Sequence, residues 1–123
     1  MQKSQVAIDA LRGPVVVDMR VLTPLFAEVT IYYHLPGEVK WTRAAHFDIS
    51  EVDDGQVSTT VPALATGSEM LLRVVLWGGN HSFIIRTALR QQQQDCHGSP
   101  LAEVKSETGA DKGEVVDIQV EVV

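Results

Sequence analysis

Apolar and polar residues alternate along much of this chain with a period of two, which is typical of β-strands that bury one face. The clearest run is 15–22, where four apolar side chains alternate with others that include Asp18 and Arg20. Residues 56–61 and 114–123 alternate in the same way, and each run is flanked by a proline or a glycine. These three runs predict strands. In the last of them, the positions expected to face inward are Val116, Ile118, Val120 and Val122.

Residues 27–49 predict a β-hairpin around the turn at Pro36-Gly37. A two-residue loop would put the apolar series of the two strands on opposite faces. A three-residue loop over 36–38 puts both series on one face, and a longer loop of the same parity does so equally well. The pairs given by the three-residue loop are Tyr33–Trp41, Val29–Ala45 and Glu28–His46.

Residues 69–90 predict a second and more apolar hairpin, with its turn at 78–81. One strand carries Met70, Leu72, Val74 and Leu76, and the other carries Phe83, Ile85 and Leu89. If Leu76 pairs with Phe83, then Arg73 lies opposite Arg86 on the other face. Trp77 shares that face with Arg73.

The remaining segments complete the expected architecture. Residues 1–13 predict a short strand or an irregular arm. Residues 91–113 predict a long, polar, mobile loop, because they are rich in glutamine and glycine and lack sustained alternation. The whole chain, 1–123, is expected to form one all-β domain. Its predicted fold is an antiparallel β-sandwich or a related β-barrel of about seven to eight strands.

Composition narrows the classes of partner. The formal net charge of −6 disfavours general binding to nucleic acid. Cys96 is the only cysteine, so no disulfide can form within the chain. Residues 1–12 lack the apolar core of a signal peptide, and no apolar run approaches the roughly 20 residues of a membrane-spanning helix. These observations favour a cytoplasmic protein that does not bind membranes.

The predicted pair of Arg73 and Arg86 is the first candidate site. Like charges directly opposite one another destabilise a sheet, so a compensating group is expected. One hypothesis is a small anionic ligand held by both guanidinium groups, with Trp77 as a stacking wall. The other hypothesis is an ion-pair ladder in which a neighbouring strand supplies Asp117 and Glu121. Exposed charge ladders are common in proteins and are mostly structural, which favours this second hypothesis.

Three further constellations carry weaker signals. His46 and Asp48 share one face and, with Glu28, form a candidate divalent-metal or acid–base site, although a solvated face explains them more simply. Glu51, Asp53 and Asp54 form an acidic turn that is a candidate calcium loop, but Asp-Gly turns also arise for backbone reasons alone. A histidine such as His97 can make a neighbouring thiol nucleophilic, but Cys96 is expected to be an exposed, inert thiol.

No nucleophile elbow, phosphate-binding loop or convincing metal motif occurs in the sequence. We therefore expect a non-enzymatic binding or assembly module without a cofactor, which associates with proteins through sheet edges or faces. The closing strand is expected to leave an exposed edge, which favours a homo-oligomer. The alternative is a small-ligand domain or a small enzyme, with a pocket between the sheets or under the 91–113 loop.

Overall fold

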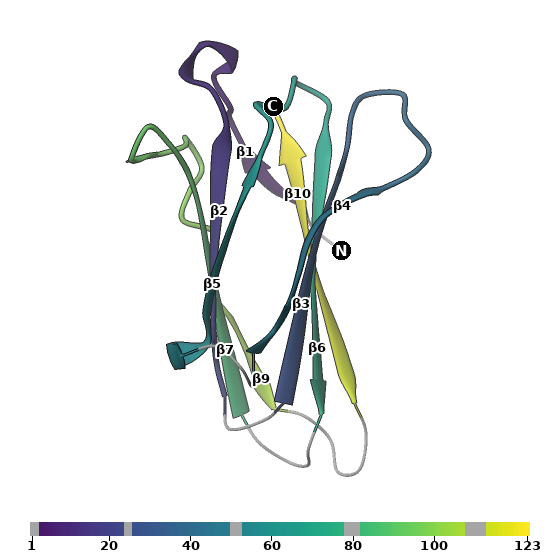
Figure 1. The fold of residues 1–123 in the computed structure, drawn as a ribbon, viewed down its shortest axis with the longest axis vertical. Coiled ribbons are helices and arrows are strands. Elements are labelled where there is room, and N and C mark those ends of the chain that lie inside the picture. Colours follow the sequence, from purple (N-terminus) through teal and green to yellow (C-terminus); the bar gives the residue numbers. More distant parts are fainter. Residues whose placement is uncertain (1–2, 24–25, 50–52, 78–81, 108–112) are drawn as a thin grey trace.

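The computed structural model describes residues 3–23, 26–49, 53–77, 82–107 and 113–123. Two β-sheets pack face to face and confirm the predicted all-β, sandwich-like fold (Figure 1). Short 3-10 helices are the described helical elements: η1 (Ala10–Arg12) and η3 (Asp53–Gly55). No helix in the described ranges is long and apolar enough to cross a membrane.

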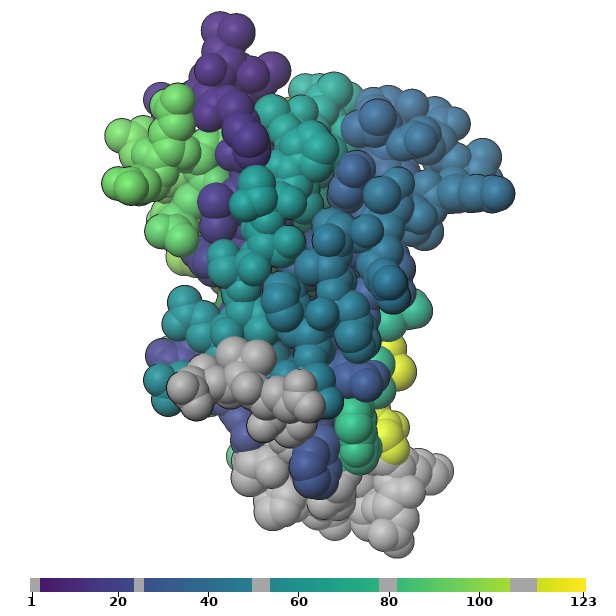
Figure 2. All heavy atoms as spheres, viewed as in Figure 1, coloured from purple at the N-terminus to yellow at the C-terminus, as the bar shows by residue number. Residues whose placement is uncertain are grey.

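Each sheet is named here after one of its central strands. The β6 sheet has the order β1 (Ser4–Val6), β10 (Glu114–Val122), β6 (Glu69–Trp77), β3 (Phe26–His34) and β4 (Thr42–Asp48). The β7 sheet has the order β5 (Gln56–Val61), β2 (Val15–Leu22), β7 (Ser82–Gln91) and β8 (Gln94–Asp95), with β9 (Val104–Glu107) also paired with β7. Strands β4 and β5 lie next to each other along one side of the sandwich, as Figure 2 shows.

The core lies between the two sheets and is built from the alternating positions that the sequence marks as apolar. Along β2, every second residue from Val15 to Val21 is buried. The β6 positions at Met70, Leu72, Val74 and Leu76 are fully buried, and so are Phe83, Ile85 and Leu89 of β7. Burying each large aliphatic or aromatic side chain contributes about 1.5–3 kcal/mol before entropy is counted. Because every second side chain of these strands is fixed in the core, the side chains between them face outward on each sheet.

The expected strands over 15–22, 56–61 and 114–123 are confirmed as β2, β5 and β10. Strand β10, however, is not the outermost strand along its whole length. The N-terminal arm supplies β1, which runs parallel to β10 and pairs with Val120 to Val122. The sequence left open whether residues 1–13 form a short strand or an irregular arm. The described part contains a short strand and, after Asp9, the helix η1.

The predicted second hairpin is wrong. Strands β6 and β7 belong to different sheets, so Arg73 does not lie opposite Arg86. Arg73 is paired instead with Asp117 and Thr30, whereas Arg86 is paired with Arg20 of β2. The reason is that alternation determines which side chains are buried, and burial is satisfied equally by pairing within a sheet or by facing across the core.

The three-residue-loop register of the first hairpin is wrong, whereas a longer connection of the same parity, which the sequence left open, is confirmed over 28–31. The observed pairs are Val29–Phe47 and Ile31–Ala45, which keep the expected parity but imply a longer connection. A bulge between Ile31 and Tyr32 then shifts the register, and Glu28 faces Asp48 rather than His46. Trp41 therefore lies outside the strands, in the connection that protrudes at one end of the molecule (Figure 2).

The region 91–113 is not one long structureless loop. Its described part contains β8 and β9, which pair with β7 along the edge away from β2 (Figure 1). The amide of Cys96 donates to the carbonyl of Leu89 at 2.9 Å, and the amide of Leu101 donates to that of Thr87 at 2.9 Å. Cys96 and Leu101 are each 7% exposed and belong to the core, so this segment closes one edge of the β7 sheet.

Candidate functional site

On the outer face of the β6 sheet, Arg73 has a carboxylate partner. Its Nε donates to Oδ1 of Asp117 at 2.8 Å and its Nη2 donates to Oδ2 at 3.0 Å. This two-pronged hydrogen bond raises the pKa of Arg73 above its already high ordinary value. Asp117 is one of the two acids that the ion-pair hypothesis named, whereas the other, Glu121, pairs across the strands with Glu69. The ion pair with Asp117 gives Arg73 a structural role.

Trp77 lies at the end of the same face, where it stacks on a neighbour instead of flanking Arg73. The rings of Trp77 and Phe26 have centroids 6.2 Å apart and an angle of 23° between their planes. Phe26 is 55% exposed, Trp77 is 37% exposed and Val115 is 57% exposed. Val115 pairs with Val75, one step along from the aromatic pair. We call Phe26, Val75, Trp77 and Val115 the apolar strip.

The apolar strip ends beside an open length of strand. On the side of β10 away from β6, β1 pairs only with Val120 to Val122. Among the described residues, the part of β10 from Glu114 to Gln119 has no strand partner on that side. Open edges of this kind are templates for pairing with another chain. Sequence reasoning expected an edge at Val123, whereas the structure places it in the first two-thirds of β10.

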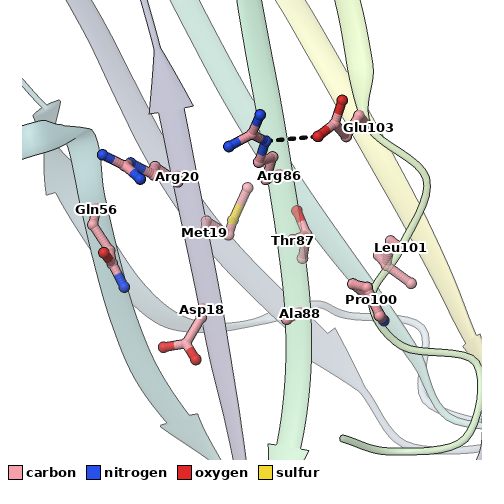
Figure 3. Close-up of a pocket in the computed structure, with 10 residues that line it drawn as sticks. All are labelled: Asp18, Met19, Arg20, Gln56, Arg86, Thr87, Ala88, Pro100, Leu101 and Glu103. Atoms are coloured by element: carbon pink, nitrogen blue, oxygen red, sulfur yellow. Dashed lines mark hydrogen bonds and ion pairs between the residues drawn. The ribbon is translucent and has the colours of Figure 1, made fainter.

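Arg86 lies on the outer face of the other sheet, where it pairs across the strands with Arg20 (Figure 3). Nε of Arg86 donates to Oε1 of Glu103 at 2.6 Å, and this hydrogen bond lowers the pKa of Glu103. Nε of Arg20 donates to the carbonyl of Asp54 at 3.3 Å. Within the described part of the chain, no ion pair joins Arg20 to a carboxylate. An arginine therefore does face Arg86, but it is Arg20 rather than Arg73.

A cavity of about 240 Å³ opens beside this arginine pair, and we call it the arginine pocket. Its floor includes Ala88, and the segment between β8 and β9 supplies Pro100 and Leu101 (Figure 3). Asp18 also lines it and forms an ion pair with Arg90. Sequence reasoning missed Arg20 because its strand was assigned no neighbour, and it missed Ala88 because its strand was assigned the wrong one. The pairing of β2 with β7 reveals both residues.

The candidate metal residues do not form a coordination site. His46 faces Thr30, and its Nδ1 lies 2.8 Å from the Thr30 hydroxyl oxygen. Glu28 and Asp48 face each other in the next pair. Among the described residues, no group of three histidine, cysteine, aspartate or glutamate side chains could hold a metal ion. For the acidic turn, Glu51 and the side chain of Asp53 lie outside the described residues.

The expectation of an exposed Cys96 is wrong. Its thiol is buried, and this burial raises the pKa of Cys96. Nearby, the buried Gln91 holds the arm in place by donating from Nε2 to the carbonyls of Asp9 and Gly13, each at 2.8 Å. These contacts give the residues around Cys96 a structural explanation.

A further polar cluster joins the arm to the β6 sheet. Glu69 accepts from Lys3 and lies 2.9 Å from Nε2 of His34, whose ring meets Trp41 edge-on at a centroid distance of 4.2 Å. The hydrogen bond from Lys3, followed by that from His34, lowers the pKa of Glu69. The cluster explains why Trp41, although outside the strands, is only 41% exposed.

Comparisons with known proteins place the chain in no family. No protein-family model matches it, and no curated protein matches it. A crystal structure of a domain of unknown function, DUF4425 from Bacteroides vulgatus, aligns with a TM-score of 0.49 and 8% sequence identity. The alignment covers 90% of this chain and 97% of that domain. A similarity at this level carries no argument about function.

Proposed function

We propose that this protein is a non-enzymatic binding module that adds an extended segment of a partner protein to the open edge of β10. The observation that carries the proposal is the coincidence of an unpaired strand edge with the apolar strip. In strand addition, main-chain hydrogen bonds supply affinity and side-chain contacts beside the strand supply specificity. The edge of β10 offers the first, and Val115 with Trp77 offers the second.

The size of the apolar strip favours an extended segment over a large docking surface. An aromatic side chain buries about 150–250 Å² when fully covered, so the exposed fractions give the strip roughly 200–300 Å² of accessible surface. A stable interface between globular partners buries about 800 Å² on each side. The strip is therefore too small to hold a globular partner alone, but it is sufficient as an anchor beside main-chain pairing.

Charge sets the expected composition of the added segment. Strand β10 carries Glu114, Asp117 and Glu121, and Asp117 alone among them is held by Arg73. A segment that combines apolar with basic side chains complements this edge. The homo-oligomer expected from the sequence is the special case in which the segment is β10 of a second copy. Two acidic edges and two chains of charge −6 weigh against that case.

The test uses a synthetic peptide of alternating valine and lysine, titrated into ¹⁵N-labelled protein. We expect the amide signals of β10 and of Trp77 to shift and the amides of 114–119 to become protected from hydrogen exchange. The double variant Trp77→Ser, Val115→Lys should lose most of the affinity, because it removes the anchor. Val39→Lys is the matched control, since Val39 is 94% exposed but lies far along the chain from the apolar strip.

A second control is the same peptide interrupted by proline, which cannot donate along a strand edge. It should bind much more weakly than the uninterrupted peptide. Shifts on β4 or β5 in place of β10, or equal binding by the proline-containing peptide, would contradict strand addition. Light scattering on the free protein separates the two kinds of partner: a monomer supports a different chain, and a dimer abolished by Val115→Lys supports a second copy.

A further inference from the structure

We propose that the arginine pocket binds a small carboxylate with an apolar body. This site lies on the opposite sheet from the apolar strip and is independent of the binding function proposed above. Four features of the pocket support it: the position of the two guanidinium groups, their uncommitted donors, the balance of charge in the lining, and the size and apolar character of the floor.

The pairing of β2 with β7 places Arg20 directly opposite Arg86. Cross-strand neighbours have Cβ atoms about 4.5–5.5 Å apart, and two like charges at that distance are unfavourable unless something negative lies between them. In Figure 3 the Arg20 side chain extends toward Gln56, whereas Arg86 turns its Nε to Glu103 and its terminal nitrogens to the side of β2. Both side chains line the same cavity.

Each guanidinium group is engaged in the described structure through its Nε alone. Nε of Arg20 donates to the Asp54 carbonyl, and Nε of Arg86 donates to Glu103. An arginine has five N–H donors, so the terminal nitrogens of both side chains have donors to spare. A carboxylate between the two side chains could accept from both, and such hydrogen bonds between ionised groups are about twice as strong as those between neutral groups.

The charges that line the pocket match a ligand with one negative charge. Two arginines and two acids, Asp18 and Glu103, line the cavity. From outside the lining, Arg90 forms an ion pair with Asp18 and Lys105 forms one with Glu103. The site as a whole therefore carries a net positive charge, although the protein is acidic. The apolar part of the lining favours a carboxylate with an apolar body over inorganic phosphate, which would leave that part uncovered.

The floor and wall of the pocket are apolar and set the size of the ligand. Ala88 is the small side chain between the arginine level and the next pair along, and Pro100 and Leu101 form the wall. Pockets for drug-sized ligands usually enclose about 300–1,000 Å³. A cavity of about 240 Å³ admits a smaller molecule, with a carboxylate at one end and an apolar body of the size of a benzene ring.

Sodium benzoate is the test probe, followed by amide shifts of the labelled protein at constant ionic strength. Benzyl alcohol is the neutral probe of matched shape, and inorganic phosphate is the anion without an apolar body. We expect saturable shifts in β2, β7 and the 100–103 segment with benzoate. Benzyl alcohol and phosphate should each bind at least about tenfold more weakly, since a hydrogen bond to a charged group corresponds to a factor of about ten or more.

Two variants separate charge from shape, and one controls for arginine loss in general. Arg20→Gln should weaken benzoate binding about ten- to a hundredfold. Ala88→Leu keeps both arginines but fills the floor, so it should abolish binding. Arg73→Gln removes an arginine from the other outer face and should bind benzoate as the unaltered protein does.

The variants remain informative about folding, because each free variant must reproduce the amide spectrum of the unaltered protein away from the substituted strand. The proposal is overturned if benzoate produces no saturable shifts, or if its affinity is unchanged in Arg20→Gln or Ala88→Leu. It is also overturned if phosphate binds as tightly as benzoate, which would make the site a general anion site.

Discussion

The two sheets bury similar inner faces but present different outer faces. The outer face of the β6 sheet pairs its central arginine with Asp117 and leaves the apolar strip exposed beside an open strand edge. The outer face of the β7 sheet places Arg20 against Arg86, and the segment that follows β7 runs along the edge of that strand. On the first face Arg73 has a carboxylate partner beside exposed apolar surface. On the second face two arginines lie side by side, and among the described residues only Arg86 of the two forms an ion pair.

This difference separates contacts that stabilise the fold from surfaces that are available for binding. The ion pair between Arg73 and Asp117 contributes to the stability of the fold. The apolar strip beside the open edge of β10 is a surface that nothing covers in the free chain. A pair of like charges that the fold retains is a local conflict, and such conflicts concentrate at functional sites. Substitutions on the two faces should therefore distinguish residues that stabilise the fold from residues that are available to bind a ligand.

The largest expected effect on the free energy of unfolding concerns Leu101, in the segment that runs along the edge of β7. Leu101 is 7% exposed and belongs to the core, so Leu101→Ala should lower the free energy of unfolding by about 2–4 kcal/mol. Val39→Ala, at an exposed position, should change it by less than about 0.5 kcal/mol. Urea denaturation measures both. Equal effects would mean that this segment does not pack as described.

The next prediction compares the two arginines by the sign of the change. Arg73→Thr should lower the free energy of unfolding by about 1 kcal/mol, since it breaks a half-exposed, two-pronged ion pair. Arg20→Thr should raise it by about 0.2–1 kcal/mol, because it relieves the repulsion by Arg86. Parallel urea titrations test the pair. A loss of stability in both variants would remove the conflict on which the arginine pocket rests.

The apolar strip should matter little for folding. Phe26→Ser is expected to change the free energy of unfolding by less than about 1 kcal/mol, because the side chain is 55% exposed and contacts mainly Trp77. The same change should raise solubility, which ultracentrifugation of concentrated samples measures. A large loss of stability would instead make the aromatic pair part of the fold.

The smallest effect concerns acid, and it applies to both outer faces. Arg86 lowers the pKa of Glu103, and Lys3 lowers that of Glu69, from an ordinary value of 4.5. Both carboxylates therefore stabilise the fold above about pH 4.5, and this contribution is lost as pH falls through their lowered pKa values. Glu103→Gln and Glu69→Gln should each make the melting temperature slightly less sensitive to acid. An unchanged pH profile in both variants would contradict the described ion pairs.

Alternation along the sequence predicted much of the fold. It identified β2, β5 and β10 and the inward positions of β6 and β7, because burial of one face is a local property of each strand. It could not identify partners across long distances. The chain passes from β6 to β7 between sheets, and the alternation of Leu76 and Phe83 is the same whether they pair or face each other across the core.

The candidate sites depended on those partners and were predicted less well. Arg86 was expected to face an arginine and does so, but only the sheet order reveals that this arginine is Arg20. The apolar strip joins residues from three strands, of which Phe26 and Val115 gave no signal of their own in the sequence. His46 lies opposite Thr30 instead of its expected carboxylate neighbour, because the register differs by two residues, one of which the bulge contributes.

The most direct test of the difference between the two faces is one labelled sample titrated with both probes. The valine–lysine peptide should shift amides of β10, β6 and β3, and sodium benzoate should then shift a separate set in β2, β7 and 100–103. Neither probe should alter the affinity of the other. Shifts from both probes on one sheet, or mutual exclusion between them, would contradict the assignment of separate roles to the two outer faces.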